Sequence, residues 1–318
     1  MPRIAIIGTG GTIQNTDAGR LSLETVLADI RAHGSRPLPA DVELETTELL
    51  SGGAETFGPS EWLTIATAVD AAARRDNVDG VVLTHGTFTA EETAYVLHLV
   101  IRSAKPIVLA VSQRKHDAIG NDGDRNLVDA IRVAGAPQSA GMGVLLVVSD
   151  EIHSARDVTK EHRHLAGFRS NHGTLGGIES DQVTFYRRPL RRHTVTSALD
   201  LAALAEMPRV DIVTAYPGAD GSAIEAFIAA GAQGLVTSGY AYSGVATPTQ
   251  MELLRAAAEG GLAVVLASRG REGRIPDAGR DWGVRGDNLT PQKARILLGL
   301  GLTLTRRRTE LQELFDTH

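Results

Sequence analysis

The chain has 318 residues, of which 42% are hydrophobic and 22% are charged, and its net charge is −6 at pH 7. This is the composition of a globular protein with two domains, or with one large core and an appendage, and it excludes the disordered, collagen-like and coiled-coil classes. The mild acidic balance argues against a nucleic-acid partner or an anionic membrane, and the lack of cysteine excludes disulfides, a thiolate nucleophile and cysteine-based metal sites.

The first half of the sequence alternates short β-branched runs with helical stretches. Strands are expected at residues 4–8, 42–47, 80–84, 106–111 and 144–149, and helices at residues 23–32, 60–73, 90–102 and 126–134. Four of the strands are continuously apolar or nearly so, as in a sheet buried on both faces, whereas residues 42–45 alternate and suit a more exposed strand. The pattern predicts an α/β fold with a mainly parallel sheet.

The alternation stops at a basic, proline-containing segment, RRPLRRH at residues 187–193, and restarts at residue 210. We therefore expect a larger catalytic α/β domain at residues 1–187, a linker at residues 188–208 and a smaller α/β domain at residues 209–318. In the smaller domain, strands are expected near residues 210–215, 234–237 and 263–267, and helices near residues 222–230, 248–259 and 291–298. The basic segment has no interleaved aromatic residues, which favours a solvated linker over a nucleic-acid patch.

No apolar run, such as that at residues 143–148, approaches the roughly 20 residues that a membrane-spanning helix needs. The first three residues lead directly into the first expected strand, and no signal peptide is recognisable. We therefore expect a cytoplasmic protein.

The first expected strand ends in a glycine-rich turn, Gly8-Thr9-Gly10-Gly11-Thr12-Ile13. In α/β folds, ligands bind at the carboxyl ends of such strands. Because Ile13 occupies the place of the third glycine in the dinucleotide-binding pattern, NAD or FAD is not expected. The turn does supply a hydroxyl group, on Thr12, beside backbone N–H groups that can face a developing oxyanion. An ordinary tight turn with a capping threonine is the alternative.

The third expected strand runs into a second hydroxyl-rich turn, THGTFT at residues 84–89, and then into a helix that begins at Thr89 or Ala90. Glu91 and Glu92 are interpreted mainly as acids that suit the positive end of the helix dipole. Thr87 belongs to the same sheet edge as Thr12, so two threonines from different strand ends can converge on one carbonyl group.

Lysine is rare in this chain, with only four lysines among the 32 basic residues. Lys160 lies downstream of the fifth strand and, unlike arginine, can act as a base when it is desolvated. A threonine paired with a lysine is a recognised way to activate a hydroxyl nucleophile. His153, His162 and His164 lie nearby, but their spacing matches no metal-binding pattern, and no metal site is expected.

Together these segments resemble the bacterial-type asparaginase/glutaminase family of amidohydrolases. The resemblance is carried by TGGTI at residues 9–13, GVVLTHGT at 80–87 with EETAY at 91–95, and DEIHSAR at 150–156 with TK at 159–160. It continues through VDIV at residues 210–213, YPG at 216–218 and NLTPQKAR at 288–295, and so covers nearly the whole chain.

The resemblance implies the asparaginase fold and a Thr12 nucleophile that forms an acyl-enzyme with an amide substrate, releases the amine and is freed by water. Thr87 and Lys160 are similar to two members of the family's Thr-Asp-Lys proton relay, and backbone N–H groups near Gly11 and Thr87 would hold the oxyanion. No metal or organic cofactor is implied. The family also implies a homodimer or homotetramer with active sites near a subunit interface.

The chain departs from the family's pattern at several positions. Phe88 stands in place of the relay aspartate, which in the family also grips the α-amino group of the substrate. Ala54-Glu55 replaces a serine and a polar residue that bind the α-carboxylate, and the short segment at residues 14–20 lacks the usual lid tyrosine. Tyr240 and Tyr242 replace a Gly-Asn-Gly-Asn stretch that reaches a neighbouring subunit's site. The expected substrate-binding residues are Gly11, Ala54, Glu55, Gly86, Phe88, Ser112, Tyr240 and Tyr242.

These departures predict an enzyme that still cleaves a small amide but has lost much of its recognition of a zwitterionic amino acid. The expected substrate is an acyclic amide without the amino-acid head, a lactam or a cyclic imide. Two alternatives stay open, namely a genuine L-asparaginase or glutaminase, and a non-catalytic ligand-binding or regulatory protein on the same fold.

Overall fold

A computed structural model describes residues 1–33 and 38–318 of the chain. The chain divides into two compact units, Met1–Leu201 and Ala202–His318. The division falls inside the segment predicted as a linker, residues 188–208. That segment is not simply solvated, because His193 and Thr194 are buried and a short helix, α5 (Leu201–Ala205), begins within it.

An eight-stranded sheet organises the first unit, in the order β12-β11-β8-β7-β6-β5-β1-β4. The parallel strands are β1 (Arg3–Gly8), β4 (Glu43–Glu48), β5 (Gly80–Thr84), β6 (Ile107–Ala110) and β7 (Val144–Val148). The antiparallel extension consists of β8 (Glu151–Ser154), β11 (Gly176–Glu179) and β12 (Gln182–Phe185). The mainly parallel sheet is confirmed, and the alternating strand β4 lies at an edge as expected.

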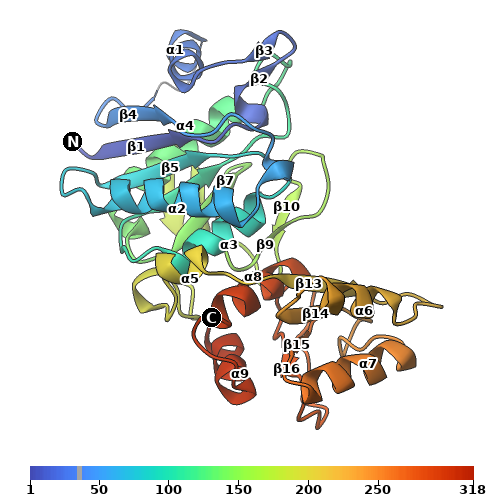
Figure 1. Cartoon of the computed structure of the whole chain (residues 1–318). Coiled ribbons are helices and arrows are strands. Elements are labelled where there is room, and N and C mark those ends of the chain that lie inside the picture. The colour runs from blue at the N-terminus through green and yellow to red at the C-terminus, as the bar shows by residue number, and fades with distance from the viewer. Residues whose placement is uncertain (34–37) are drawn as a thin grey trace. The chain divides into compact units, whose positions relative to one another are not determined.

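Four helices cover this sheet. They are α1 (Leu23–His33), α2 (Pro59–Arg74), α3 (Ala90–Val100) and α4 (Gly123–Gly135). The apolar sides of α1 and α4 share one core with inward residues of β1, β5, β6 and β7. Helices α2 and α3 pack against each other in front of the sheet in Figure 1. The start of α2 is fixed locally, since the Gly58 N–H donates to Glu61 Oε2 at 2.8 Å and Pro59 is the first residue of the helix.

Two short hairpins and several 3-10 turns connect the main elements of this unit. One hairpin pairs β2 (Asn15–Thr16) with β3 (Gly19–Arg20), and a second pairs β9 (Val158–Lys160) with β10 (Phe168–Ser170). The 3-10 turns η1 (Thr12–Gln14) and η2 (Ala54–Thr56) also lie on segments that follow the strands β1 and β4. Two further 3-10 turns are η3 (Pro137–Ser139) and η4 (Thr194–Thr196).

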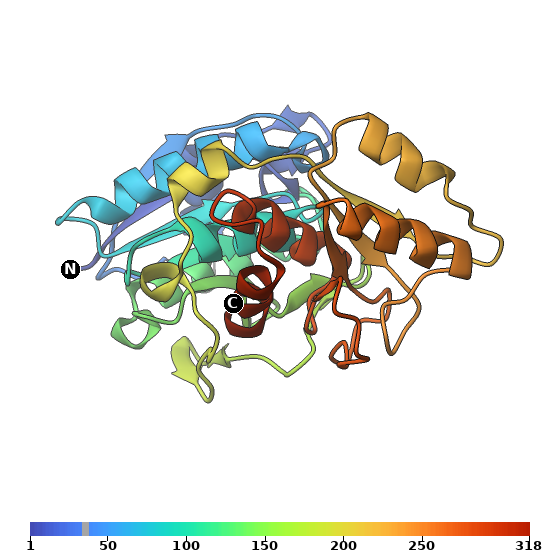
Figure 2. The ribbon, with the colours of Figure 1, turned by 60° about the horizontal axis from the view of Figure 1, so that its bottom comes forward.

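The second unit is a smaller α/β body, as predicted. Its parallel sheet has the order β13 (Val210–Thr214), β14 (Gly234–Ser238), β15 (Ala263–Leu266) and β16 (Val284–Arg285). Its helices are α6 (Ser222–Ala229), α7 (Pro248–Glu259), α8 (Pro291–Gly301) and α9 (Arg308–Thr317). Helices α6 and α7 lie next to each other in Figure 2, and their apolar residues share a core with β13, β14 and β15. Across residues 1–33 and 38–318, no helix has both the length and the apolar character to cross a membrane.

Candidate active site

The ends of β1 and β5 bring the two predicted threonine turns together. These strands are parallel neighbours with Gly8 opposite Thr84, so the segments that follow them leave the sheet at the same edge. A pocket of about 240 Å³ lies there and receives both Thr12 and Thr87. The full lining is Gly11, Thr12, Asn15, Arg20, Ser51, Gly52, Gly53, Ala54, Glu55, Gly86, Thr87 and Phe88.

The two turns approach each other so closely that only glycine fits between them. Gly11 has φ 96°, and a Cβ at this position would lie 2.5 Å from the carbonyl oxygen of His85. A Cβ on Gly86 would lie 2.6 Å from the Cβ of Ala54. The Thr89 hydroxyl donates to the Ala54 carbonyl at 2.8 Å and ties the second turn to η2. Gly11, Gly86 and Ala54 therefore form the narrow floor of the pocket.

Lys160 reaches this floor from β9. Its ammonium group donates to Thr87 Oγ1 at 2.6 Å and lies 5.0 Å from the centre of the Phe88 ring. Burial lowers the pKa of Lys160, while the charge of Glu91 raises it by a smaller amount. A lysine with a lowered pKa gives up its proton more readily, so this pair is suited to moving a proton to and from a hydroxyl group.

The mouth of the pocket carries an exposed aromatic ring, Phe88. Phe88 is 68% exposed although its neighbour Thr87 is buried. Glu55 is exposed and also lines the pocket. The pocket thus combines a polar floor with a partly apolar rim.

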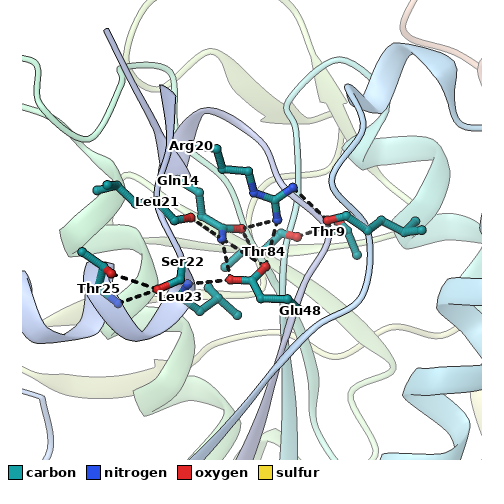
Figure 3. A network of polar contacts seen from close by, with 10 residues as sticks. Thr9, Gln14, Arg20, Leu21, Ser22, Leu23, Thr25, Glu48 and Thr84 are labelled. Carbon is teal, nitrogen blue, oxygen red and sulfur yellow. Dashed lines mark hydrogen bonds and ion pairs between the residues drawn. The ribbon is translucent and has the colours of Figure 1, made fainter. Parts of the chain in front are cut away.

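A polar network that the sequence analysis missed supports the turn that carries Thr12. The Gln14 amide donates to Glu48 Oε1 at 3.0 Å and accepts from the Thr84 hydroxyl at 3.1 Å. Arg20 pairs with Glu48 at 2.9 Å and donates to the Leu50 carbonyl at 2.8 Å. Figure 3 shows these side chains converging between β1, β4 and the β2–β3 hairpin. The network fixes Arg20 against the pocket and neutralises its charge.

The β2–β3 hairpin is also held from its other side. Asp17, at its tip, forms an ion pair with Lys115 at 2.8 Å, and the Asn15 carbonyl accepts from the His116 N–H at 2.8 Å. The hairpin is therefore clamped to the segment that follows β6. No residue of the hairpin was predicted as a site residue, because a short polar segment carries no periodic signal.

Four predicted site residues lie outside the lining of this pocket, namely Lys160, which contacts the lining residue Thr87, and Ser112, Tyr240 and Tyr242. Ser112 is fully buried, and its hydroxyl donates to the Arg114 carbonyl at 3.0 Å. Tyr240 and Tyr242 belong to the second unit, where Arg269 lies 4.8 Å above the Tyr240 ring and Tyr242 is 82% exposed. Ser112 is hydrogen-bonded locally and is not among the residues that line this pocket, and its substrate-binding role stays a prediction.

The histidines near Lys160 are not gathered around a common point. The buried His153 lies 2.9 Å from the Ser170 hydroxyl and 3.3 Å from Glu151, while His162 and His164 are exposed. In the described ranges, no group of three or more His, Asp or Glu side chains is arranged to hold a metal ion.

Comparison with known proteins assigns the chain to a family. Its residues 3–191 match the family model "Asparaginase, N-terminal", and residues 209–315 match "Glutaminase/Asparaginase C-terminal domain". The chain belongs to the asparaginase/glutaminase family. The predicted family and fold are therefore confirmed, and so is the enzyme class, an amidohydrolase acting on C–N bonds other than peptide bonds.

Relatives in the family resemble this chain over its whole length. It is 33% identical to "L-asparaginase 2" of Escherichia coli (strain K12), with 100% of this chain and 94% of the relative covered. It is 34% identical to a "Glutaminase-asparaginase" of Pseudomonas aeruginosa, with 99% and 90% covered. The crystal structure of a probable cytoplasmic L-asparaginase from Campylobacter jejuni matches with a TM-score of 0.92 and 33% identity over 100% of both chains.

The close approach of Gly86 to Ala54 generates a stability prediction. Gly86→Ala is expected to lower the free energy of unfolding by about 1–3 kcal/mol, because the new methyl group overlaps the Ala54 methyl group. The double variant Gly86→Ala/Ala54→Gly removes that overlap and is expected to be more stable than Gly86→Ala alone. Urea denaturation of the four proteins in this cycle measures the coupling. If the effects of the two single substitutions on the free energy of unfolding were strictly additive, the proposed overlap between the two methyl groups would be contradicted.

His85 generates a pH prediction. Burial lowers its pKa from 6.5 to about 4. Between those values the unfolded chain binds a proton that the folded chain does not, so stability falls as the pH drops from 6.5 to 4, by at most about 3 kcal/mol. His85→Gln is expected to lose less stability than wild type over this range, whereas the exposed control His164→Gln behaves like wild type. The free energy of unfolding is measured by urea denaturation at several pH values. An equal loss in His85→Gln and in wild type would show that His85 does not cause the loss of stability in acid.

Proposed function

We propose that this protein hydrolyses a small amide through an acyl-enzyme on Thr12, with a specificity altered away from L-asparagine and L-glutamine. The observation that carries the altered specificity is the exposed Phe88 ring at the pocket mouth, next to the Thr87–Lys160 pair. The same pocket is lined by Thr12 and the close backbone turns that amide cleavage needs, and the base, Lys160, contacts its lining residue Thr87.

The proposed reaction has two steps. The Thr12 oxygen attacks the amide carbonyl carbon while the Thr87–Lys160 pair takes up the hydroxyl proton. Backbone N–H groups of the touching turns near Gly11 and Thr87 hold the oxyanion. The relay returns the proton to the leaving nitrogen as the C–N bond breaks, and water then cleaves the ester to release the acid and restore Thr12.

The charges around the pocket support a substrate without an amino-acid head. Among the described lining residues, Arg20 is the one cation, and its pairing with Glu48 leaves it poorly placed to bind a carboxylate. The aromatic ring of Phe88 offers no partner for an ammonium group through hydrogen bonding. The loss of an anchor for a buried charged group costs about 2–5 kcal/mol, or roughly 30- to 5,000-fold in affinity. Acyclic amides lacking the α-amino group, lactams and cyclic imides are the proposed substrates.

L-Asparagine or L-glutamine hydrolysis is the second candidate function. It is supported by the names of the relatives, which include L-asparaginases and glutaminase-asparaginases at about one-third identity. The exposed carboxylate of Glu55 in the pocket also favours it, because this group is able to meet an ammonium group.

Two further expectations belong to this proposal. We propose a cytoplasmic location, in line with the description of the Campylobacter jejuni neighbour as a probable cytoplasmic enzyme. We also propose a homodimer or homotetramer whose active sites lie near a subunit interface, as the family resemblance implies.

The nucleophile is tested by Thr12→Ala on a panel of L-asparagine, L-glutamine, simple amides without an α-amino group, lactams and imides. We expect loss of about 10³-fold or more in kcat/KM on every substrate that wild type cleaves, because no other hydroxyl replaces the attacking oxygen. Thr16→Ala, which removes a hydroxyl from the neighbouring hairpin, serves as the control and retains activity. Product is followed by mass, since ring opening releases no ammonia. Unchanged turnover by Thr12→Ala would contradict this role.

The specificity proposal is tested by Phe88→Asp. The new carboxylate is expected to raise kcat/KM for L-asparagine relative to simple amides by about tenfold or more, because it supplies a partner for the α-ammonium group. Phe88→Leu removes the ring without adding charge and is expected to give no such gain. If wild type already turns over L-asparagine more efficiently than amides without the α-amino group, the altered specificity is wrong and the family's usual substrate applies.

A further inference from the structure

Lys160 is a proton-transfer group in an unusual electrostatic setting. Within the described parts of the chain it forms no ion pair, and its nearest partners are a neutral hydroxyl on Thr87 and the face of the Phe88 ring. A half-buried lysine with only these partners loses much of the stabilisation of its ammonium form. If Lys160 is to use both its amine and its ammonium form, a nearby negative charge must offset this loss of stabilisation of the ammonium form.

Glu91 is the charged group that fits this need. It lies in the first turn of α3, four positions after Thr87, and α3 packs against β9, the strand that carries Lys160. Figure 1 shows the helix beside this strand. One carboxylate oxygen, Glu91 Oε2, is buried without a hydrogen-bond partner. An unsatisfied buried carboxylate oxygen costs free energy, and such groups in native proteins point to a role other than stability.

The two effects on Lys160 have opposite signs. Burial lowers the pKa of its amine, and the negative charge of Glu91 raises it. The other two neighbours of this amine, the Phe88 ring and the Thr87 hydroxyl, carry no charge. Burial, the face of the ring and this single carboxylate together therefore set how much of Lys160 is amine and how much is ammonium.

We propose that Glu91 is a positioning residue of the relay, whose unpaired carboxylate acts on Lys160 through space and keeps both its amine and its ammonium forms available during the reaction. The amine accepts a proton when Thr12 attacks, and the ammonium returns it to the leaving nitrogen. This assignment rests on the function proposed above. It gives the relay an acid that is absent at position 88 without placing one in contact with the substrate.

A simpler role for Glu91 is stabilisation of the α3 N-terminus through the helix dipole. Glu92 shares that role, since both acids lie in the first turn of α3. The dipole effect alone predicts that the two residues behave alike. The proposal predicts that only Glu91 changes the protonation of Lys160, so Glu92 is a matched control.

The scarcity of lysine makes a direct measurement feasible. The chain has four lysines, Lys105, Lys115, Lys160 and Lys293, so protein labelled with ¹³C at lysine Cε gives few signals in NMR, and Lys160→Arg identifies the one of interest. Its pKa is read from the chemical shift as a function of pH, with no substrate present. The acid limb of the kcat/KM profile with a cleaved amide provides a second readout.

In Glu91→Gln, we expect the pKa of Lys160 to fall by about one unit, and the acid limb of the profile to move to lower pH by a similar amount. Glu91→Asp retains the charge and should restore most of the difference. Glu92→Gln should leave both readouts at their wild-type values. A Lys160 pKa that is unchanged in Glu91→Gln, or equally shifted in Glu92→Gln, would overturn the proposal.

Should Glu91→Gln fail to fold, Glu91→Ala is a second variant that removes the charge. It is expected to lower the pKa of Lys160 by a similar amount, because the same carboxylate is lost. An unchanged Lys160 pKa in Glu91→Ala would reject the coupling.

The outcomes separate this inference from the proposed function. Coupling between Glu91 and Lys160 without turnover of any amide would support the electrostatic assignment and count against the proposed function. Thr12-dependent turnover without the coupling would leave the proposed function standing and overturn the role of Glu91.

Discussion

The contact between two backbone turns at the carboxyl edge of the sheet is the constraint on which the site depends. Parallel pairing of β1 with β5 brings Gly11 against the His85 carbonyl, at a separation that no side chain allows. Both turns then project a hydroxyl group into one small pocket, and their N–H groups become available to a negative oxygen. A single methyl group at Gly86 would push η2 away, because Ala54 closes the floor from the third side. The arrangement of the site therefore depends first on the packing of the two backbone turns and only then on the side chains that they carry.

The second constraint is the polar network around Glu48, which links substrate choice to the fold. Glu48 accepts hydrogen bonds from Gln14 and from the backbone of Leu23, and it pairs with Arg20. The Glu48 carboxylate thus holds the Thr12 turn and the β2–β3 hairpin in place. The cation that lines the pocket, Arg20, is paired with this carboxylate. Under the proposed function, the interactions that order the Thr12 turn therefore also leave little positive charge for the carboxylate of an amino-acid substrate.

Much of the fold and part of the site could be predicted from sequence, for identifiable physical reasons. Buried parallel strands are continuous apolar runs, so β1, β5, β6 and β7 can be recognised in the sequence. Thr12 and Thr87 could then be predicted to lie close together, because the carboxyl ends of parallel strands lie at one edge of the sheet. Lys160 was noticed through its rarity, but its place on β9 was not, because short antiparallel strands of mixed polarity lack a periodic signal. Arg20 was missed because its importance comes from partners far away in the sequence, at Glu48 and Leu50. The local bond of the Ser112 hydroxyl to the Arg114 carbonyl was also not predictable, since adjacency to a strand end does not decide which way a side chain points.

The resemblance to the family implies an acid at the position of Phe88, and an aromatic ring there separates two tasks that one carboxylate can perform together. An acid in contact with both the relay and the substrate sets the protonation of the lysine and also selects for an ammonium group. With an aromatic ring at position 88, the contact with Lys160 is a cation–π interaction, which favours the ammonium form of the lysine but supplies no carboxylate for the ammonium group of a substrate. Glu91 acts from the helix behind, where its charge reaches Lys160 but adds no hydrogen bond to it. Under this arrangement, substitutions of Phe88 alter both substrate choice and the surroundings of Lys160, whereas substitutions at position 91 alter the relay without changing a group at the pocket mouth.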